Sequence, residues 1–413
     1  MNLYKREEYL KRIRGFYHDT EIIKVISGVR RCGKSYLLKT IINELKEKGV
    51  SDNDIIYNCI FIDLDSRKYN KIKTDQDLED LLESYSNIRG TKYIFIDEIQ
   101  NIKNFEEVIN AFRTDGEYSI FITGSNSYLL SGELVTKLTG RYIEFEIFTL
   151  SFYEYIEMKK YYNKQVDSNI INELNNYIIE GGFPKTIQYD SIIDKRSYTN
   201  AVVEEIFEKD IKKRVKVRTV ETFNLVKNFI INNYGQTMSV LSIQKGLENV
   251  GIKVRRETIT KYIDILVSAK IIYQCDRFDM KSKRALKGEK KYYLADSSFY
   301  YAINTDNRIN YGPALENVIY TYARSKKYTV SVGRIGLLEC DFILRDDYLN
   351  YSYIQIAYTI LESKKTEDRE YSSLELIKDN YPKYVLTTDF LIQKRNGIVH
   401  ANIASFINNN LMF

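Results

Sequence analysis

An eight-residue segment near the amino terminus constrains the fold of this chain more than any other feature. The segment is Gly28-Val29-Arg30-Arg31-Cys32-Gly33-Lys34-Ser35, which fits the pattern G-x-x-x-x-G-K-[ST]. The apolar run Ile22–Ser27 precedes it and an amphipathic helical pattern follows it. Glycines at these two places let the backbone turn tightly, so that successive N–H groups face phosphate oxygens. The segment therefore predicts a phosphate-binding loop between a strand and a helix.

Two residues at the end of this loop have specific expected roles. Lys34 places a positive charge on the β and γ oxygens of a nucleotide, and the Ser35 hydroxyl ligates Mg²⁺. We therefore expect ATP and Mg²⁺ to bind here. Nucleotide contacts are expected from Gly28, Arg31, Cys32, Gly33, Lys34, Ser35 and Tyr36. The side chains of Arg30 and Arg31 are expected to face solvent or a partner rather than to act in catalysis.

A second apolar run, Tyr93–Ile96, ends in two carboxylates, Asp97 and Glu98. Asp97 is expected beside the magnesium, usually through its water shell. Glu98 is expected to accept a proton from the attacking water. The alternative is a solvated strand end. Gln100 is close enough in sequence either to touch this site or only to cap a turn.

Polar residues also follow the apolar run Ser119–Thr123. In one interpretation Ser125 contacts the nucleotide and Asn126 orients the attacking water; in the other, Gly-Ser-Asn is only a turn. Further along, Arg141 precedes another strand-like run. Arg141 is either a surface residue or, in a homo-oligomer, an arginine that enters a neighbour's site and stabilises transition-state charge.

Strand-like runs alternate with helical patterns up to about residue 150. The runs are Ile22–Ser27, Ile55–Leu64, Tyr93–Ile96, Ser119–Thr123 and Tyr142–Phe148. Near-continuous apolar strands separated by helices are typical of a parallel sheet covered on both faces. The sequence therefore predicts an α/β fold with a P-loop ATPase core over residues 1–150. Residues 151–200 have mostly helical patterns and are expected to form a lid.

Residues 201–305 have a different pattern. Helical stretches near 222–234, 240–249 and 256–269 precede strand-like runs at 271–278 and 290–295, which outlines a winged helix. Ile259, Ile263 and Leu266 repeat at helical spacing and are expected in the core. This leaves Arg255, Arg256 and Lys261 near the exposed start of the helix, and the basic loop Lys281–Lys287 as the wing.

The same region carries an excess of positive charge. Residues 251–291 hold 12 Lys and Arg against 5 Asp and Glu. This segment is therefore a candidate for contact with DNA phosphates. The alternative is a packing module whose basic loop is merely solvated.

Residues 306–413 read as a further α/β unit that resembles the restriction-endonuclease-like fold. Glu316 and Asp341 match the two carboxylates that such a fold uses with a metal ion. The next strand should supply Glu-x-Lys but reads Gln355-Ile356-Ala357. A neutral amide is a poor magnesium ligand, and alanine cannot activate water. We expect a degenerate domain, unless Lys364 or Lys365 substitutes for the missing lysine.

Six segments together resemble the bacterial and archaeal AAA+-type ATPases that carry a C-terminal domain of unknown function. They are IKVISGVRRCGKSYLL (23–38), YIFIDEIQ (93–100), ITGSNSYLLSGEL (122–134), LTGRYIEFEIFTLSFYEY (138–155), GGFP (181–184) and DNYPKYVLTTD (379–389). The resemblance covers nearly the whole chain and implies an ATPase related to the signalling-type P-loop proteins. It also implies that Pro184, in a Gly-x-Pro element of the lid, contacts the nucleotide; a helix-ending turn is the alternative.

Composition says little about partners, because the net charge of +5 results from 61 basic and 56 acidic residues. Four scattered cysteines with no CxxC pair suit free thiols in a reducing compartment. The charged start, Met1–Gly15, has no apolar core like that of a signal peptide. No apolar run approaches the roughly 18 residues of a membrane span. We expect a cytoplasmic protein without a membrane segment.

These features predict an ATPase, slow or stimulated by a partner, that acts as a switch. Its nucleotide state would control binding of the C-terminal domains to DNA or to a protein partner. Two alternatives remain open: an ATP-gated, magnesium-dependent nuclease, and a non-hydrolytic interaction module that holds a nucleotide.

Overall fold

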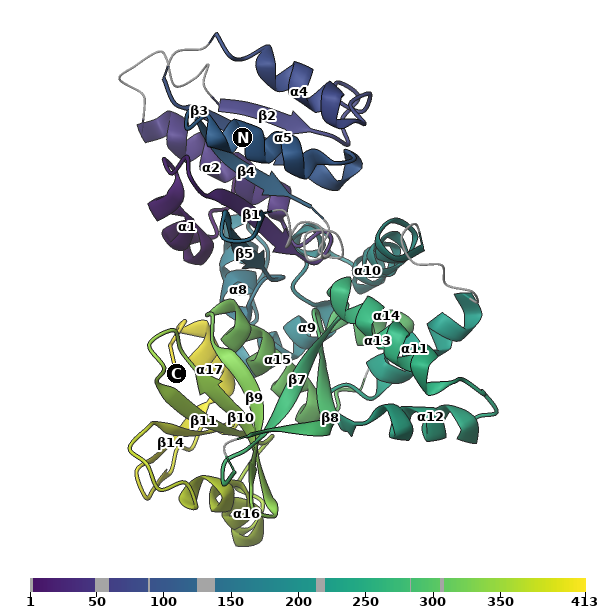
Figure 1. The fold of residues 1–413 in the computed structure, drawn as a ribbon. Coiled ribbons are helices and arrows are strands. Elements are labelled where there is room, and N and C mark those ends of the chain that lie inside the picture. Colours follow the sequence, from purple (N-terminus) through teal and green to yellow (C-terminus); the bar gives the residue numbers. More distant parts are fainter. Residues whose placement is uncertain are drawn as a thin grey trace. The chain divides into compact units, whose positions relative to one another are not determined.

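The computed structural model describes residues 3–48, 59–87, 90–124, 138–212, 220–282, 284–304 and 308–413. The chain forms two compact units, Met1–Ile147 and Phe148–Phe413 (Figure 1). The first unit contains the phosphate loop and ends close to residue 150, where the sequence predicts the end of the ATPase core. Among the described residues, no helix has both the length and the apolar character needed to cross a membrane.

A parallel sheet forms the centre of the first unit. Its strands in the described residues are β1 (Ile23–Gly28), β2 (Cys59–Asp63), β3 (Lys92–Asp97), β4 (Tyr118–Thr123) and β5 (Tyr142–Ile147), in the spatial order β2-β3-β4-β1-β5. Every neighbouring pair is parallel. All residues of β1, β3 and β4 are buried, which explains their nearly unbroken apolar runs. The predicted α/β class with a parallel sheet is confirmed.

Helices cover both faces of this sheet (Figure 1). On one face, α4 (Asp75–Glu83) and α5 (Phe105–Thr114) share a core with strand residues such as Ile94 and Ile120. Phe95 and Phe121 point to the opposite face by strand alternation, where their rings stack with centroids 4.7 Å apart. The other helices among the described residues of this unit are α1 (Glu7–Ile13), η1 (Arg14–Phe16), α2 (Lys34–Lys48) and η2 (Ile99–Asn101), and α2 contacts β1 and β4.

The second unit begins with the helices of the predicted lid region. They are α8 (Phe152–Tyr161), α9 (Ile170–Glu180), η3 (Pro184–Gln188) and α10 (Ile192–Ile206), followed by the π-helical η4 (Phe207–Lys212). Gly181 ends α9 with a φ of 77°, and the Gly182 N–H donates to the buried Asp296 carboxylate at 2.8 Å. A Cβ on Gly181 would lie 2.0 Å from Asp296 Oδ1. Close packing therefore requires a glycine at this turn.

Three helices and a hairpin follow in the predicted order. They are α11 (Val220–Asn232), β6 (Thr237–Met238), α12 (Val240–Asn249), α13 (Arg256–Ser268), β7 (Ile272–Asp279) and β8 (Arg284–Leu294). Ile259, Ile263 and Leu266 are buried, as expected. The prediction of a loop over Lys281–Lys287 is wrong, because β8 already begins at Arg284 and Ala285 pairs with Phe278. Cross-strand pairing satisfies backbone groups here without any apolar pattern in the sequence.

The hairpin belongs to a larger sheet. After it come α14 (Ser298–Ile303), α15 (Tyr311–Ser325), β9 (Thr329–Ile335), β10 (Leu338–Arg345), β11 (Tyr351–Ile356), α16 (Lys364–Glu375), β12 (Lys383–Thr387), β13 (Lys394–Arg395), β14 (Ile398–Asn402) and α17 (Ile403–Asn408). The nine strands found among the described residues run β13-β14-β12-β11-β10-β9-β7-β8-β6. Because β7 pairs in parallel with β9, this sheet continues across the predicted boundary between residues 305 and 306.

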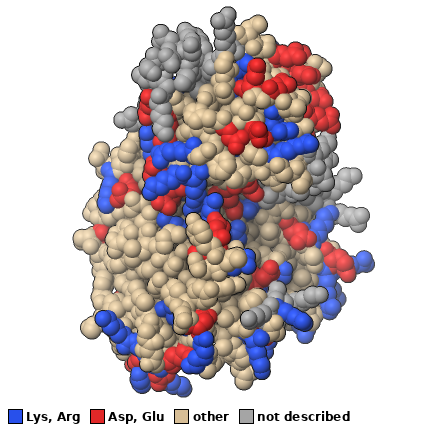
Figure 2. Space-filling view, turned by 60° about the vertical axis from the view of Figure 1, so that its left-hand side comes forward, with Lys and Arg blue, Asp and Glu red and all other residues tan. Residues whose placement is uncertain are grey.

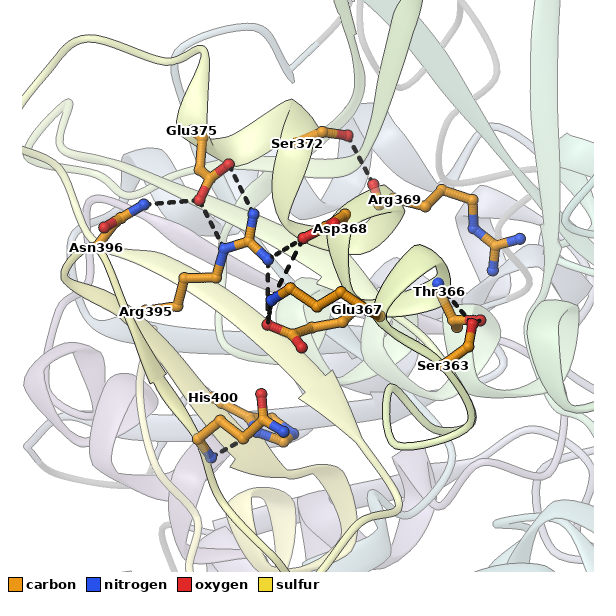
Figure 3. Close-up of polar contacts among 12 residues, drawn as sticks. Ser363, Thr366, Glu367, Asp368, Arg369, Ser372, Glu375, Arg395, Asn396 and His400 are labelled. Carbon is orange, nitrogen blue, oxygen red and sulfur yellow. Dashed lines mark hydrogen bonds and ion pairs between the residues drawn. The ribbon is translucent and has the colours of Figure 1, made fainter.

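A charged cluster fastens α16 to β13 (Figure 3). Arg395 donates to both carboxylate oxygens of Glu375, at 2.8 and 3.1 Å. It also contacts Glu367 at 3.1 Å and Asp368 at 2.5 Å. Hydrogen bonds from Arg395 hold the pKa of the Glu375 carboxyl below its usual range. Arg395 thus contacts three carboxylates of the same helix, and Lys364 also pairs with two of them, Glu367 and Asp368. These ion pairs let a very polar helix pack against the sheet.

Candidate functional site

The phosphate loop connects β1 to α2 with a backbone that only certain residues adopt. Gly28 has a φ of 142° and Gly33 a φ of 109°. A Cβ on Gly28 would lie 2.2 Å from the Ile147 carbonyl oxygen, so no other residue fits there. The Cys32 N–H donates to the Val29 carbonyl at 3.2 Å and closes the turn. Both glycines of the sequence pattern are therefore required by geometry.

Lys34 begins α2 and lies inside the loop. Its side chain is largely buried, and Nζ donates to the carbonyl oxygens of Gly28 at 2.9 Å and Val29 at 3.3 Å. These carbonyls hold the ammonium against the loop, where the backbone wraps around an anion in sites of this kind. Tyr36, two residues after Lys34, has an exposed side chain (58%). Arg31 is exposed too and adopts a left-handed backbone with φ of 67°.

Asp97 ends β3 beside the loop. Its carboxylate is only 4% exposed and is hydrogen-bonded by Ser35 and by the Thr123 hydroxyl at the end of β4. Burial raises the pKa of Asp97, and the hydrogen bonds from Ser35 and Thr123 act in the opposite direction. A carboxylate and a hydroxyl are hard oxygen ligands of the kind that Mg²⁺ prefers. Ser35 and Asp97 could therefore hold a magnesium ion, whose charge would stabilise phosphate oxygens.

Glu98 follows Asp97 in a left-handed conformation, with φ 59° and ψ 46°. Such a backbone is uncommon for a residue with a side chain and often marks a functional position. The Glu98 N–H donates to Thr123 Oγ1 at 3.1 Å. Gln100 Nε2 donates to Glu98 Oε2, and Arg30 Nη2 lies 3.9 Å from the same oxygen. The Glu98 side chain is 16% exposed and is contacted by Gln100 and Arg30, while its backbone is held by Thr123.

The expectation that Arg30 faces solvent or a partner is wrong. Its side chain is only 10% exposed and forms an ion pair with Glu98. The neighbouring Arg31 has a left-handed backbone and an exposed side chain. Two adjacent arginines of one loop therefore have different surroundings, which the sequence pattern does not distinguish.

Arg141 lies far from the loop within its own chain. Tyr142, the first residue of β5, pairs with Ile23, the first residue of β1. Arg141 is therefore at the amino ends of the strands, whereas the loop follows the carboxyl end of β1, roughly 20 Å away along a six-residue strand. The Arg141 guanidinium donates to Asn110 Oδ1 at 3.3 Å.

Three other predicted site residues are placed as follows. Ser125 and Asn126 lie outside the described residues. Pro184 is in the second unit, where it begins η3. Two further residues contact the site or its loop and were not predicted from the sequence. One is Thr123, whose place at the end of an apolar strand was an available signal; the other is Arg6, whose guanidinium donates to the Cys32 carbonyl at 3.2 Å and which no sequence pattern marks.

The carboxylates of the C-terminal unit surround a buried lysine. Lys291 Nζ, on β8, lies 3.0 Å from Glu316 Oε2 and 2.9 Å from Glu339 Oε1. Burial opposes the charge of Lys291, but Glu316, Asp341 and Glu339 outweigh it, so the pKa of the lysine is raised. Asp341 is buried, which raises its pKa, and it accepts the Ile356 N–H at 2.8 Å.

Gln355, in the position where the restriction-endonuclease-like resemblance requires Glu, donates to Glu370 at 3.0 Å. In the part of the chain that the structure describes, no group of three or more His, Cys, Asp and Glu side chains is arranged to hold a metal ion. The ammonium of Lys291 occupies the place between Glu316 and Glu339. These carboxylates serve as partners of a lysine in this structure.

Two family models match the chain. One, described as "AAA domain", matches residues 20–156, and the other, described as "Domain of unknown function (DUF8612)", matches residues 171–308. An uncharacterized protein of Haemophilus influenzae is 34% identical over 94% of this chain and 94% of its own length. An uncharacterized protein of Methanocaldococcus jannaschii is 30% identical over 90% of this chain and 84% of its own.

Two solved structures show weaker likeness. The Walker-type ATPase PABY2304 of Pyrococcus abyssi is 15% identical, with a TM-score of 0.48, over 73% of this chain and 95% of that one. The ORC1 protein of Aeropyrum pernix, in a complex with DNA, is 12% identical, with a TM-score of 0.36, over 74% of this chain and 93% of that one.

Proposed function

Because the chain belongs to the family of bacterial and archaeal proteins that join an AAA domain to a domain of unknown function, we propose that it is an ATP-driven switch. The AAA domain makes it a nucleotide-binding ATPase in general terms. In the proposal, the nucleotide state controls the binding of the C-terminal elements to DNA or to a protein partner.

One observation carries the proposal. Ser35, at the start of α2, is joined by hydrogen bonds through Asp97 to Thr123, at the carboxyl ends of β3 and β4, with Glu98 next to them. In this arrangement Lys34 binds the β- and γ-phosphates, while Ser35 and Asp97 hold Mg²⁺.

Glu98 takes a proton from a water molecule whose oxygen bonds to the γ-phosphorus. The bond from that phosphorus to the β–γ bridging oxygen breaks, and its electron pair stays with ADP. Thr123 keeps both acidic residues in place through its hydroxyl.

Phosphate release from ATP tests this function. Glu98→Gln is expected to retain ATP but to lower the turnover number by about a hundredfold or more, because the amide cannot accept the proton. Lys34→Ala is expected to lose ATP binding itself. Normal turnover by Glu98→Gln would show that another group is the base.

For the partner, the proposal favours DNA contact by α13 and the β7–β8 hairpin, read as a winged helix. Arg255, Arg256 and Lys261 are exposed at the start of α13. Figure 2 shows basic and acidic side chains interspersed on the face drawn, with broad uncharged areas between them. Charge of one sign therefore does not dominate the face drawn, and the three named residues are tested directly.

Equilibrium binding of duplex DNA at several salt concentrations provides that test. Lys261→Gln and Arg255→Gln should each reduce the salt dependence by about one released counterion, if these side chains contact phosphates. Lys378→Gln, which removes an exposed lysine from the same unit, serves as the control. If the salt dependence of DNA binding has the same slope for all three variants, these residues do not contact DNA and a protein partner is favoured instead.

We do not propose the nuclease alternative, because Lys291 is the ion-pair partner of Glu316. Cutting of plasmid DNA in the presence of ATP and Mg²⁺, abolished in Asp341→Ala, would reinstate it.

A further inference from the structure

Arg30 takes no part in the proposed reaction, although its guanidinium lies beside the proposed base. It is the third residue of the phosphate loop, and its guanidinium lies 3.9 Å from Glu98 Oε2. Its side chain is 10% exposed, and that of Glu98 is 16% exposed. A pair this sheltered from water interacts more strongly than an exposed ion pair.

The contact involves the oxygen of Glu98 that is already engaged. Gln100 Nε2 donates to the same Oε2, and the backbone of Glu98 is fixed by the Thr123 hydroxyl. Gln100 lies on η2 and Thr123 on β4, outside the phosphate loop. Arg30 differs, because it is part of the loop that wraps the phosphates.

A triphosphate in the loop would compete with Glu98 for this guanidinium. A guanidinium binds the oxygens of a phosphate or a carboxylate through the same planar set of donors. The γ-phosphate carries more negative charge than one carboxylate and would lie against the loop that holds Arg30. ADP lacks this group, so only ATP offers the second partner.

We propose that Arg30 is a positioning residue that couples the phosphate loop to Glu98. Before ATP binds, Arg30 holds the Glu98 carboxylate; when ATP binds, Arg30 moves to the γ-phosphate and releases Glu98 to accept the proton of the attacking water. This inference rests on the proposed ATPase function. It explains why Glu98 would act as the base only when ATP, and not ADP, is bound.

A double-mutant cycle on nucleotide affinity tests the exchange. The dissociation constant of the β,γ-imido analogue of ATP is measured for the parent, Arg30→Met, Glu98→Gln and the double variant. If Arg30 exchanges partners, Glu98→Gln removes the carboxylate that competes for it and strengthens analogue binding by about tenfold in the parent background. The same change should have a clearly smaller effect in the Arg30→Met background, where it relieves only the repulsion between the carboxylate and the triphosphate. ADP should show no such coupling in either background.

A static ion pair predicts the opposite sign. If Arg30 only neutralises Glu98, removing Arg30 leaves the carboxylate to repel the triphosphate. Glu98→Gln would then strengthen analogue binding more in the Arg30→Met background than in the parent. That result, or equal effects in both backgrounds, would overturn the inference.

Two further variants exclude trivial explanations. Arg31→Met removes the same charge from the neighbouring, exposed position. Its effect on the affinity for the ATP analogue should add to that of Glu98→Gln without coupling. Arg30→Lys keeps a positive charge without the planar donor set, and it should keep the sign of the coupling at a reduced size. A thermal melt of every variant shows whether it is folded.

The outcomes also separate this inference from the function on which it rests. Turnover of ATP without the predicted coupling would refute the exchange and leave the ATPase intact. If the Arg30 and Glu98 variants show the predicted coupling in analogue affinity but the parent does not hydrolyse ATP, the exchange is supported and hydrolysis is refuted. A parent protein that binds neither nucleotide would refute both.

Discussion

At the carboxyl end of β4, the hydroxyl of Thr123 serves two neighbours in the site. It donates to the Asp97 carboxylate and accepts the Glu98 N–H at 3.1 Å. This small side chain fixes the Asp97 carboxylate and the backbone of Glu98 at the same time. The position of both residues is therefore a property of the two strands β3 and β4 rather than of β3 alone.

Thr123→Val should test this arrangement because it keeps the shape and removes only the hydroxyl. The Glu98 N–H and a buried carboxylate oxygen would lose a partner, which costs about 1–3 kcal/mol for each buried group. We expect the turnover number for ATP to fall by roughly tenfold or more. Thr123→Ser should restore most of it, and a valine variant with parental turnover would contradict the assignment.

A buried lysine in β1 gives a prediction about pH. Lys24 is fully buried, and its Nζ donates to the Asp19 carbonyl at 2.5 Å and to Ser119 Oγ at 2.9 Å. Burial lowers the pKa of Lys24 to about 7. Between pH 7 and the ordinary value of 10.5, the unfolded chain therefore binds a proton that the folded chain does not. Stability should rise with pH across this window.

Melting temperatures from pH 7 to 9.5 provide the measurement. Lys24→Met should remove the upward slope that Lys24 contributes and should be more stable than the parent near pH 7, where the parent must bury the cation. A parent whose melting temperature has the same slope as that of Lys24→Met would show that Lys24 is not the cause.

At the scale of elements, Lys291 connects the β7–β8 hairpin to α15 and β10. The lysine is 5% exposed and pairs with Glu316 and Glu339. Lys291→Met would leave these carboxylates without their cation in a mostly buried place, at a cost of about 3–5 kcal/mol. We expect a lower melting temperature for the second unit, measured by calorimetry.

The neighbouring Lys290 supplies the control. It is 32% exposed and pairs with the exposed Asp276 at 3.2 Å, so Lys290→Met should cost under about 1 kcal/mol. Combining Lys291→Met with Glu316→Met should recover part of the loss, since both halves of the pair are then apolar. Equal melting temperatures for Lys290→Met and Lys291→Met would contradict the connecting role.

The elements themselves differ in how well their sequences predict them. The strands β1 and β3 are buried on both faces, so their apolar runs predict them directly. The limits of α12 agree with the predicted 240–249. The pairing of β7 with β9 could not be predicted, because it joins residues such as Arg277 and Val332 that are far apart in the chain. Only tertiary packing determines that contact.

The candidate site shows the same division. The spacing of Gly28, Lys34 and Ser35 and the two acids after β3 predict the loop and its neighbours, because function demands those residue types. The burial of Arg30 against Glu98 depends on the torsion angles of the loop. No pattern in one sequence fixes those angles.

For the whole molecule, the position of Arg141 bears on assembly. It lies at the amino ends of the strands, away from the loop of its own chain. If it acts in catalysis, we propose that it does so in the site of a neighbouring copy. Arg141→Ala should then lower turnover by at least about tenfold without weakening ATP binding.

Mixing experiments distinguish this role from a local one. Arg141→Ala and Lys34→Ala are each expected to be impaired alone. Mixed subunits should regain activity, because Arg141 of the Lys34→Ala copy can serve the intact loop of the other. Arg113→Ala is the control, since Arg113 also contacts Asn110, at 3.2 Å. No recovery on mixing would contradict action between copies.

Binding of radiolabelled ATP to the purified protein, with Mg²⁺ varied, tests the central claim most directly. We expect saturable ATP binding that becomes stronger as Mg²⁺ is added. Lys34→Ala should abolish this binding, and Asp97→Asn should make it respond less to Mg²⁺. A parent protein that retains no adenine nucleotide at any Mg²⁺ concentration, or a Lys34→Ala variant that binds it equally well, would contradict the account.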